Sequence, residues 1–152
     1  MKFLCDEMLA GLGRWLRIAG FDTLIVPTGM PDTEVIKQVE GCNRYFLTCD
    51  AELASRLNNY PALLHLSNSD IESCIKELNN NLKLDWTSHA FERCSVCNSI
   101  FQTAPKSKII ANKIDLSKNR QIYYCPRCDK LYWEGSHVKH MRKKLKLFNA
   151  LN

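Results

Sequence analysis

Hydrophobic and polar positions follow two alternating patterns along the first 84 residues. Short apolar runs at residues 2–5, 23–27, 44–48 and 62–66 predict four β-strands. Residues 8–19, 32–40, 51–57 and 70–82 are predicted helices, and the first carries Leu9, Leu12, Trp15, Leu16 and Ala19 at 3.6-residue spacing. Strands that alternate with helices indicate an α/β fold with a mostly parallel sheet and flanking helices.

The later part of the chain carries two Cys-x-x-Cys pairs instead. Cys94 and Cys97 form the first pair, Cys125 and Cys128 form the second, and 27 residues lie between the two pairs. Two such turns supply four thiolates to one ion, so the spacing predicts a zinc site with residues 106–118 as a long outer loop. The alternatives are two redox dithiols or two disulfides. We therefore predict an α/β domain at residues 1–84 and a zinc ribbon with a basic C-terminal helix at residues 85–152, joined by a hinge at 85–89.

Charge divides the chain in the same way. Residues 1–88 hold 8 basic and 12 acidic side chains, whereas residues 89–152 hold 13 basic and 4 acidic ones. This division suggests that the basic part holds a polyanion while the acidic part holds a cation or carries out chemistry. A basic surface that only aids solubility is the alternative.

An aspartate follows each predicted strand: Asp6, Asp32, Asp50 and Asp70. In a parallel sheet these turns share the carboxyl edge, where open α/β folds place their sites. Converging carboxylates favour a bound hard cation such as Mg²⁺ or Mn²⁺. Aspartate is also a favoured helix N-cap. Capping is the better interpretation for Asp70, Asp32 fits both roles, and Asp6 and Asp50 are the stronger site candidates.

Basic and aromatic residues supply candidate contacts to nucleic acid. Arg14 and Arg17 stand three apart on one predicted helix, where salt bridges within the domain are an equal alternative. Basic residues interleaved with aromatics in the ribbon suit single-stranded nucleic acid, although a small ribbon also needs aromatics for its own core. The predicted nucleic-acid-binding residues are Arg14, Arg17, Arg93, Arg127, Trp133, His137, Arg142, Lys143 and Lys144.

Composition favours a cytoplasmic protein. Residues 1–9 already contain Asp6 and Glu7, which argues against a secretory signal, and no apolar run approaches the ~18 residues of a membrane helix. The four cysteines outside the ribbon pairs lie in or beside apolar runs, as free thiols do in a reducing compartment.

Seven short segments carry a resemblance to a known family. Residues 3–9 (Phe-Leu-Cys-Asp-Glu-Met-Leu), 13–17, 20–23 and 46–53 resemble the opening and second motif of the mutator-seven C-terminal RNase domain family, and residues 91–98, 124–128 and 132–137 resemble its zinc ribbon. The resemblance implies a PIN-like nuclease domain fused to a zinc ribbon, with metal-dependent RNase activity. It carries over Asp6, Asp32 and Asp50 as the acidic set and the four ribbon cysteines as zinc ligands. Cys49 departs from the family pattern, in which a basic residue is expected.

The combined hypothesis is a metal-dependent ribonuclease that hydrolyses RNA phosphodiester bonds. Asp6, Asp32 and Asp50 would hold catalytic Mg²⁺ or Mn²⁺, with Glu34 or Asp70 as alternatives that complete the set, and a structural Zn²⁺ would hold the ribbon that positions RNA. The RNA is expected to be single-stranded or structured, and no membrane association is expected. A non-catalytic RNA- or ribosome-binding adaptor and a protein-interaction module are the alternative functions.

Overall fold

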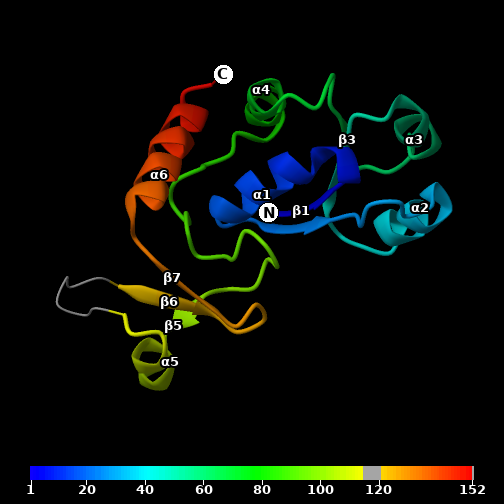
Figure 1. Ribbon diagram of the computed structural model, residues 1–152. Helices are drawn as coiled ribbons and strands as arrows, with labels where there is room; N and C mark the ends of the chain where they lie inside the picture. Colours follow the sequence, from blue (N-terminus) through cyan, green and yellow to red (C-terminus); the bar gives the residue numbers. More distant parts are fainter. Residues whose placement is uncertain (115–120, 152) are drawn as a thin grey trace.

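The first part of the chain is a parallel α/β sheet. The computed structural model describes residues 1–114 and 121–151 (Figure 1). Strands β1 (Lys2–Cys5), β2 (Asp22–Ile25), β3 (Tyr45–Thr48) and β4 (Leu63–His65) pair in parallel in the order β2-β1-β3-β4. They alternate with the short 3-10 helix η1 (Glu7–Leu9) and the helices α1 (Ala10–Ile18), α2 (Asp32–Glu40), α3 (Ala51–Arg56) and α4 (Ile71–Leu82). The predicted α/β class and the order of its elements are confirmed.

Both faces of this sheet are covered. Successive side chains of a strand point to opposite faces, so Phe3 and Cys5 belong to one core cluster and Leu4 to the other. The first cluster includes buried residues of α1, α4 and α6 (Ser136–Asn149), whereas the second includes buried residues of α2 and α3. Helices therefore cover both faces of the sheet. The two ends of its strands, the amino edge and the carboxyl edge, remain open for function.

The ribbon is a small antiparallel sheet of β5 (Gln102–Thr103), β6 (Ile122–Cys125) and β7 (Lys130–Trp133). Helix α5 (Lys106–Ala111) lies within the segment predicted as a loop, so that prediction is wrong for these residues, and residues 115–118 of the loop lie outside the described residues. The Pro105 carbonyl accepts bonds from Lys108 and Ile109, which starts the helix. Lys108 also reaches Asp129 at 2.6 Å and ties α5 to the turn between β6 and β7.

Helix α6 returns to the α/β part. Leu145 is fully buried and Phe148 is 5% exposed, and the Phe148 ring lies 5.1 Å from Trp15 and 5.4 Å from Trp86. The hydrophobic core therefore crosses the domain boundary predicted between residues 84 and 85. The basic C-terminal helix packs on the sheet-bearing part rather than on the ribbon that precedes it (Figure 1). Over residues 1–114 and 121–151, no helix combines the length and the apolar character needed to cross a membrane.

Asn79 of α4 holds the C-terminal end of α6 and the Trp86 side chain through hydrogen bonds. Its Oδ1 accepts a 2.8 Å bond from the Trp86 indole, and its Nδ2 donates to the carbonyls of Phe148 at 2.8 Å and Leu151 at 2.5 Å. We expect Asn79→Ala to lower the free energy of unfolding by about 2–4 kcal/mol, because a buried indole N–H loses its acceptor and two carbonyls lose their donor. Urea denaturation measures this change. Asn80→Ala, at the exposed neighbouring position, is the matched control, and an equal effect of both changes would contradict the role of Asn79.

Candidate functional site

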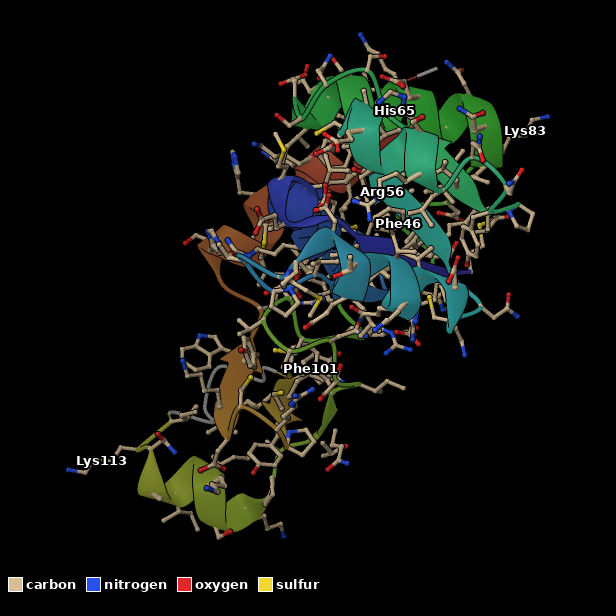
Figure 2. All side chains as sticks on the ribbon, turned by 90° about the vertical axis from the view of Figure 1, so that its right-hand side faces the viewer. Phe46, Arg56, His65, Lys83, Phe101 and Lys113 are labelled. Atoms are coloured by element: carbon tan, nitrogen blue, oxygen red, sulfur yellow. The ribbon has the colours of Figure 1, made fainter. Side chains whose placement is uncertain are left out.

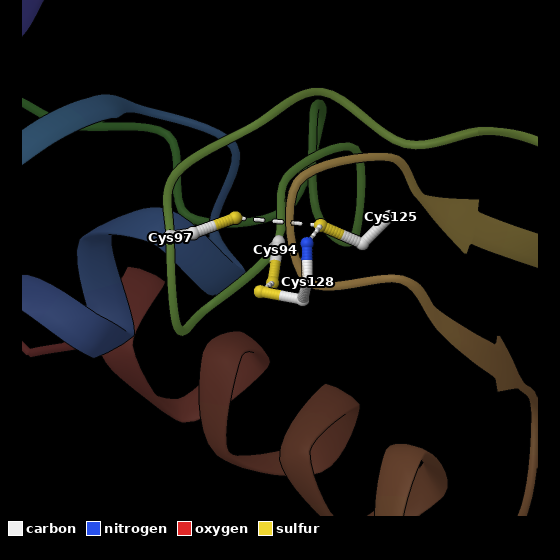
Figure 3. Close-up of side chains that lie close together, drawn as sticks. All are labelled: Cys94, Cys97, Cys125 and Cys128. Carbon is white, nitrogen blue, oxygen red and sulfur yellow. Dashed lines mark hydrogen bonds between the residues drawn. The ribbon is translucent and has the colours of Figure 1, made fainter.

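Four thiols converge in the ribbon (Figure 3). Cys94 and Cys97 lie on one turn, Cys125 ends β6, and Cys128 lies in the turn before β7. Their sulfur atoms all lie within 4.8 Å of one another, with 3.3 Å between Cys97 and Cys125 and 3.9 Å between Cys94 and Cys128. A tetrahedral ZnS₄ centre with Zn–S bonds of about 2.3 Å has S–S edges of about 3.8 Å. The ligand set and its dimensions therefore fit a zinc ion, and all eight cysteines of the chain are free of disulfides.

The surroundings favour the metal-binding thiolate form at Cys97, whereas burial and hydrogen bonds to the neighbouring thiols raise the pKa of Cys125 and Cys128. The Cys128 backbone N–H donates to the Cys125 sulfur at 3.4 Å. Burial raises the pKa of the Cys97 thiol, but hydrogen bonds with Ser99, Cys125 and Cys128 outweigh burial and lower the pKa to about 6. Since metal ligation requires the thiolate, these contacts favour metal binding at Cys97, and binding at the other thiols releases their protons.

Arg17, on α1 of the α/β part, donates hydrogen bonds to the turn between Cys94 and Cys97. The side chain is only 7% exposed; its Nε donates to the Thr23 carbonyl at 2.8 Å, and its Nη1 donates to the carbonyls of Val96 at 2.8 Å and Ser95 at 3.2 Å. The prediction that Arg17 contacts nucleic acid is therefore corrected. Arg17 points inward while Arg14, three residues earlier, is exposed. The guanidinium group satisfies backbone carbonyls where two segments meet, a task that its fork of donors suits.

Arg93 and Asn98 complete this contact between ribbon and sheet. Arg93 donates to the carbonyls of Gly20 at 3.1 Å and Asn98 at 3.0 Å. The Asn98 side chain accepts from the Thr23 N–H at 3.1 Å and donates to Asp22 at 2.7 Å. Gly20 has φ of +97°, and a Cβ there would lie 2.2 Å from the His89 carbonyl oxygen, so only glycine permits this approach. The ribbon consequently docks at the amino edge of the sheet, where β2 begins.

Carboxylates gather at the opposite edge. Asp6 follows β1 and is 6% exposed; its Oδ2 accepts a 2.8 Å bond from the Thr48 hydroxyl at the end of β3. The same Thr48 oxygen accepts the Asp50 N–H at 3.0 Å. The chain runs from β1 to β2 on one side and β3 lies on the other, so the carboxyl ends of β1 and β3 form the switch point of the sheet. Open α/β folds bind ligands at this place.

Both of these aspartates also cap helices. Asp6 Oδ1 accepts from the Glu7 N–H at 2.7 Å, and Asp50 Oδ1 accepts from the N–H groups of Glu52 and Leu53 at 2.8 and 3.0 Å. In each residue only Oδ1 accepts the capping bonds, so the second carboxylate oxygen can take part in a site. The second oxygen of Asp6 faces Thr48 of the neighbouring strand.

The other aspartates are engaged elsewhere. Asp32, at the start of α2, accepts a 3.0 Å bond from Arg56 of α3, which Figure 2 labels. Asp70 caps α4 by accepting the Ser73 N–H at 3.0 Å, as the favoured interpretation of its sequence position predicts. Among the described residues, the ribbon thiols are the group of three or more potential ligands that meets within 4.8 Å. The structure therefore links Asp6 with Asp50 through Thr48 and does not bring Asp32 into the same cluster.

Sequence reasoning missed two residues at the carboxyl edge. Glu7 Oε2 accepts the Gly29 N–H at 2.7 Å and so ties the loop after β2 to the acidic edge. Its position directly after Asp6 at a strand end was the available signal. Arg56 had no such signal, because only the fold brings α3 beside the start of α2.

Cys49 adjoins both central carboxylates. Burial raises the pKa of its thiol, and the negative charges of Asp6 and Asp50 raise it further. Cys49 therefore stays a neutral thiol beside the acidic pair. It leaves this edge without the basic side chain that the family resemblance implies at this position.

All but one of the remaining predicted nucleic-acid contacts lie on the surface. Trp133 is 43% exposed at the end of β7. Arg142 lies 4.8 Å from the centre of the Phe91 ring, and Lys144 lies 5.7 Å from that of Trp15. Exposed side chains complete the set: Arg14, Arg127, His137 and Lys143. Arg93 is half-buried and bonded to carbonyls, so it serves the contact between ribbon and sheet.

The fold and its two sites define a class of protein: a parallel α/β domain with an acidic carboxyl edge, joined to a four-cysteine ribbon. A family model described as Mut7-C RNAse domain matches residues 1–145, and the chain belongs to this family. No curated protein and no solved structure gave a match. Family membership confirms the resemblance seen in the sequence, points to a nuclease, and implies RNA as a substrate or partner.

Proposed function

We propose that the protein is a metal-dependent ribonuclease whose active site is the carboxyl edge between β1 and β3. The observation that carries this proposal is a hydrogen-bonded series from the Asp6 carboxylate through the Thr48 hydroxyl to the Asp50 backbone N–H. It joins two adjacent strand ends at the switch point of the sheet. Membership of an RNase family supports it independently.

The donors at this edge fit a hard divalent cation. Asp6 and Asp50 offer carboxylate oxygens, which Mg²⁺ and Mn²⁺ prefer, and these two residues would hold the ion. When bound, such an ion activates water and neutralises charge on the leaving oxygen of a phosphodiester. Thr48 holds one Asp6 oxygen in place by donating its hydroxyl proton. Asp32 stays a predicted ligand, since its ion pair with Arg56 is exposed and such pairs contribute little energy.

The ribbon has a structural part in this proposal. Its four thiolates would hold zinc, and Arg17, Arg93 and Asn98 join the zinc turns to the sheet. The ribbon thereby offers basic surface next to the nuclease domain, where it positions RNA. The protein is proposed to act in the cytoplasm.

Cleavage of end-labelled RNA with added Mn²⁺ tests the function. We expect Asp50→Asn to slow cleavage by about 1,000-fold, because several kcal/mol of metal-derived stabilisation of the transition state is lost. Asparagine caps a helix as well as aspartate does, so the fold of α3 is kept while the charge is removed.

Asp70→Asn is the matched control, because Asp70 also caps a helix but lies outside the acidic pair. It should cleave like the wild type. Zinc content and thermal stability are measured for every variant, and metal-free RNA binding is measured in parallel. If the wild type binds RNA but does not cleave it, the proposed nuclease activity is refuted and the RNA-binding adaptor is favoured.

A further inference from the structure

The outer face of α6 is unusually basic. Between Ser136 and Asn149 the helix has five Lys or Arg residues and no Asp or Glu. Four of them, Lys139, Arg142, Lys143 and Lys146, follow the i, i+3, i+4, i+7 spacing that places side chains along one face. All four are exposed, whereas Leu145 and Phe148 on the other side are buried. We name these four residues the cation ridge.

The ridge is electrostatically unfavourable in the protein alone. Like charges three or four residues apart repel along a helix, and the ridge contains four such pairs. Elsewhere in the described chain, Arg44, Arg56 and Lys108 each lie within 3.0 Å of an aspartate. On the ridge, the described residues supply one carboxylate contact, Arg142 to Glu134 at 3.5 Å. A polyanion that lies along the face would relieve this repulsion.

The ridge lies far from the acidic pair. Helix α1 starts beside Asp6 at the carboxyl edge and returns to the amino edge, and its nine residues span about 13.5 Å. Helix α6 contacts the later parts of α1 and α4, through Trp15 and Asn79. Figure 1 accordingly shows α6 at the left, above the ribbon, with α1 and β1 between it and helices α2 and α3 at the right. An RNA that touches both sites therefore has to cover a distance on the order of the length of α1.

We propose that the cation ridge binds the phosphate backbone of the RNA substrate several nucleotides away from the bond that is cut. This inference rests on the proposed function, which places the cut at Asp6 and Asp50. A separation on the order of the ~13.5 Å length of α1 corresponds to roughly four nucleotides at a helical rise of about 3.4 Å per nucleotide. RNAs of about this length or shorter cannot occupy both places.

Binding of labelled RNA without Mg²⁺ or Mn²⁺ tests the ridge separately from catalysis. The variant Lys143→Gln/Lys146→Gln removes two ridge charges that make no contact with an aromatic ring or carboxylate in the described structure. With a slope of about −0.7 per phosphate of a single strand, it should bind an RNA of about 20 nucleotides roughly 25-fold more weakly at about 0.1 M salt. Its salt slope should be smaller by about 1.4, and it should bind an RNA of about four nucleotides with a smaller deficit.

Lys37→Gln/Lys76→Gln is the matched control, with the same charge change on the exposed faces of α2 and α4. An equal loss in this control would show a general effect of net charge and overturn the proposal, as would unchanged binding by the ridge variant. A ridge variant that keeps RNA binding but loses binding to vesicles of anionic lipid would reassign the face to a membrane surface. If Asp50→Asn still cleaves, the proposed active site fails while the ridge result stands.

Discussion

Removal of zinc is expected to unfold the ribbon and to lower the melting temperature of the α/β core by about 10 °C. Among the described residues of the ribbon, the buried apolar side chains besides Cys94 and Cys125 are Ala104 and Ile122. A core of this size cannot hold a fold, whereas structural zinc contributes about 10–16 kcal/mol in small zinc domains. The α/β core should respond because an unfolded ribbon releases the contacts of Arg17, Arg93 and Asn98, worth about 2–4 kcal/mol together.

Tryptophan fluorescence separates the two responses. Of the three tryptophans, Trp133 lies in the ribbon, whereas Trp15 and Trp86 pack in the α/β core. A Trp133→Phe background therefore reports on the core alone during thermal unfolding with and without a zinc chelator. Returning zinc should restore the original melting temperature. If the melting temperature of the core stays the same with the chelator, in protein shown to have lost its zinc, the ribbon and the core are energetically independent.

The sequence predicted the sheet and its order of elements because each signal was local. Apolar runs and helical spacing are properties of neighbouring residues, and the boundaries of α2 match the predicted residues 32–40. The four-thiol cluster was equally predictable, since a Cys-x-x-Cys pair fixes its own turn and two pairs complete one site.

The other features could not be predicted from the sequence, because they depend on contacts between residues far apart in the chain. Arg17 has the same local surroundings as Arg14 on α1, and only the docked ribbon, 78 residues away, buries one and leaves the other exposed. The core contacts of α6 were likewise not predicted. Its sequence is mostly basic, and only the fold places Phe148 against Trp15 and Trp86. Asp32 could not be assigned from sequence, since its ion pair with Arg56 depends on how α2 and α3 lie together.

Replacement of Arg17 by methionine is expected to destabilise the whole protein by about 3–5 kcal/mol. Methionine fills much of the space but leaves the carbonyls of Thr23, Ser95 and Val96 without their donor. Thermal unfolding in the Trp133→Phe background measures the loss. Arg14→Met is the matched control on the same helix, and its exposed position predicts a change within about 0.5 kcal/mol.

The decisive comparison combines this substitution with zinc removal. If Arg17 transmits the stability of the zinc turn to the sheet, the chelator should lower the core melting temperature much less in Arg17→Met than in the wild type, because the two perturbations break the same contacts. Arg17→Lys keeps the charge but cannot reach three carbonyls, so it should show an intermediate loss and an intermediate response to zinc. A variant that unfolds at a lower temperature yet keeps the full response to zinc would show that Arg17 only packs within the α/β part, and would assign the coupling to Arg93 and Asn98 instead.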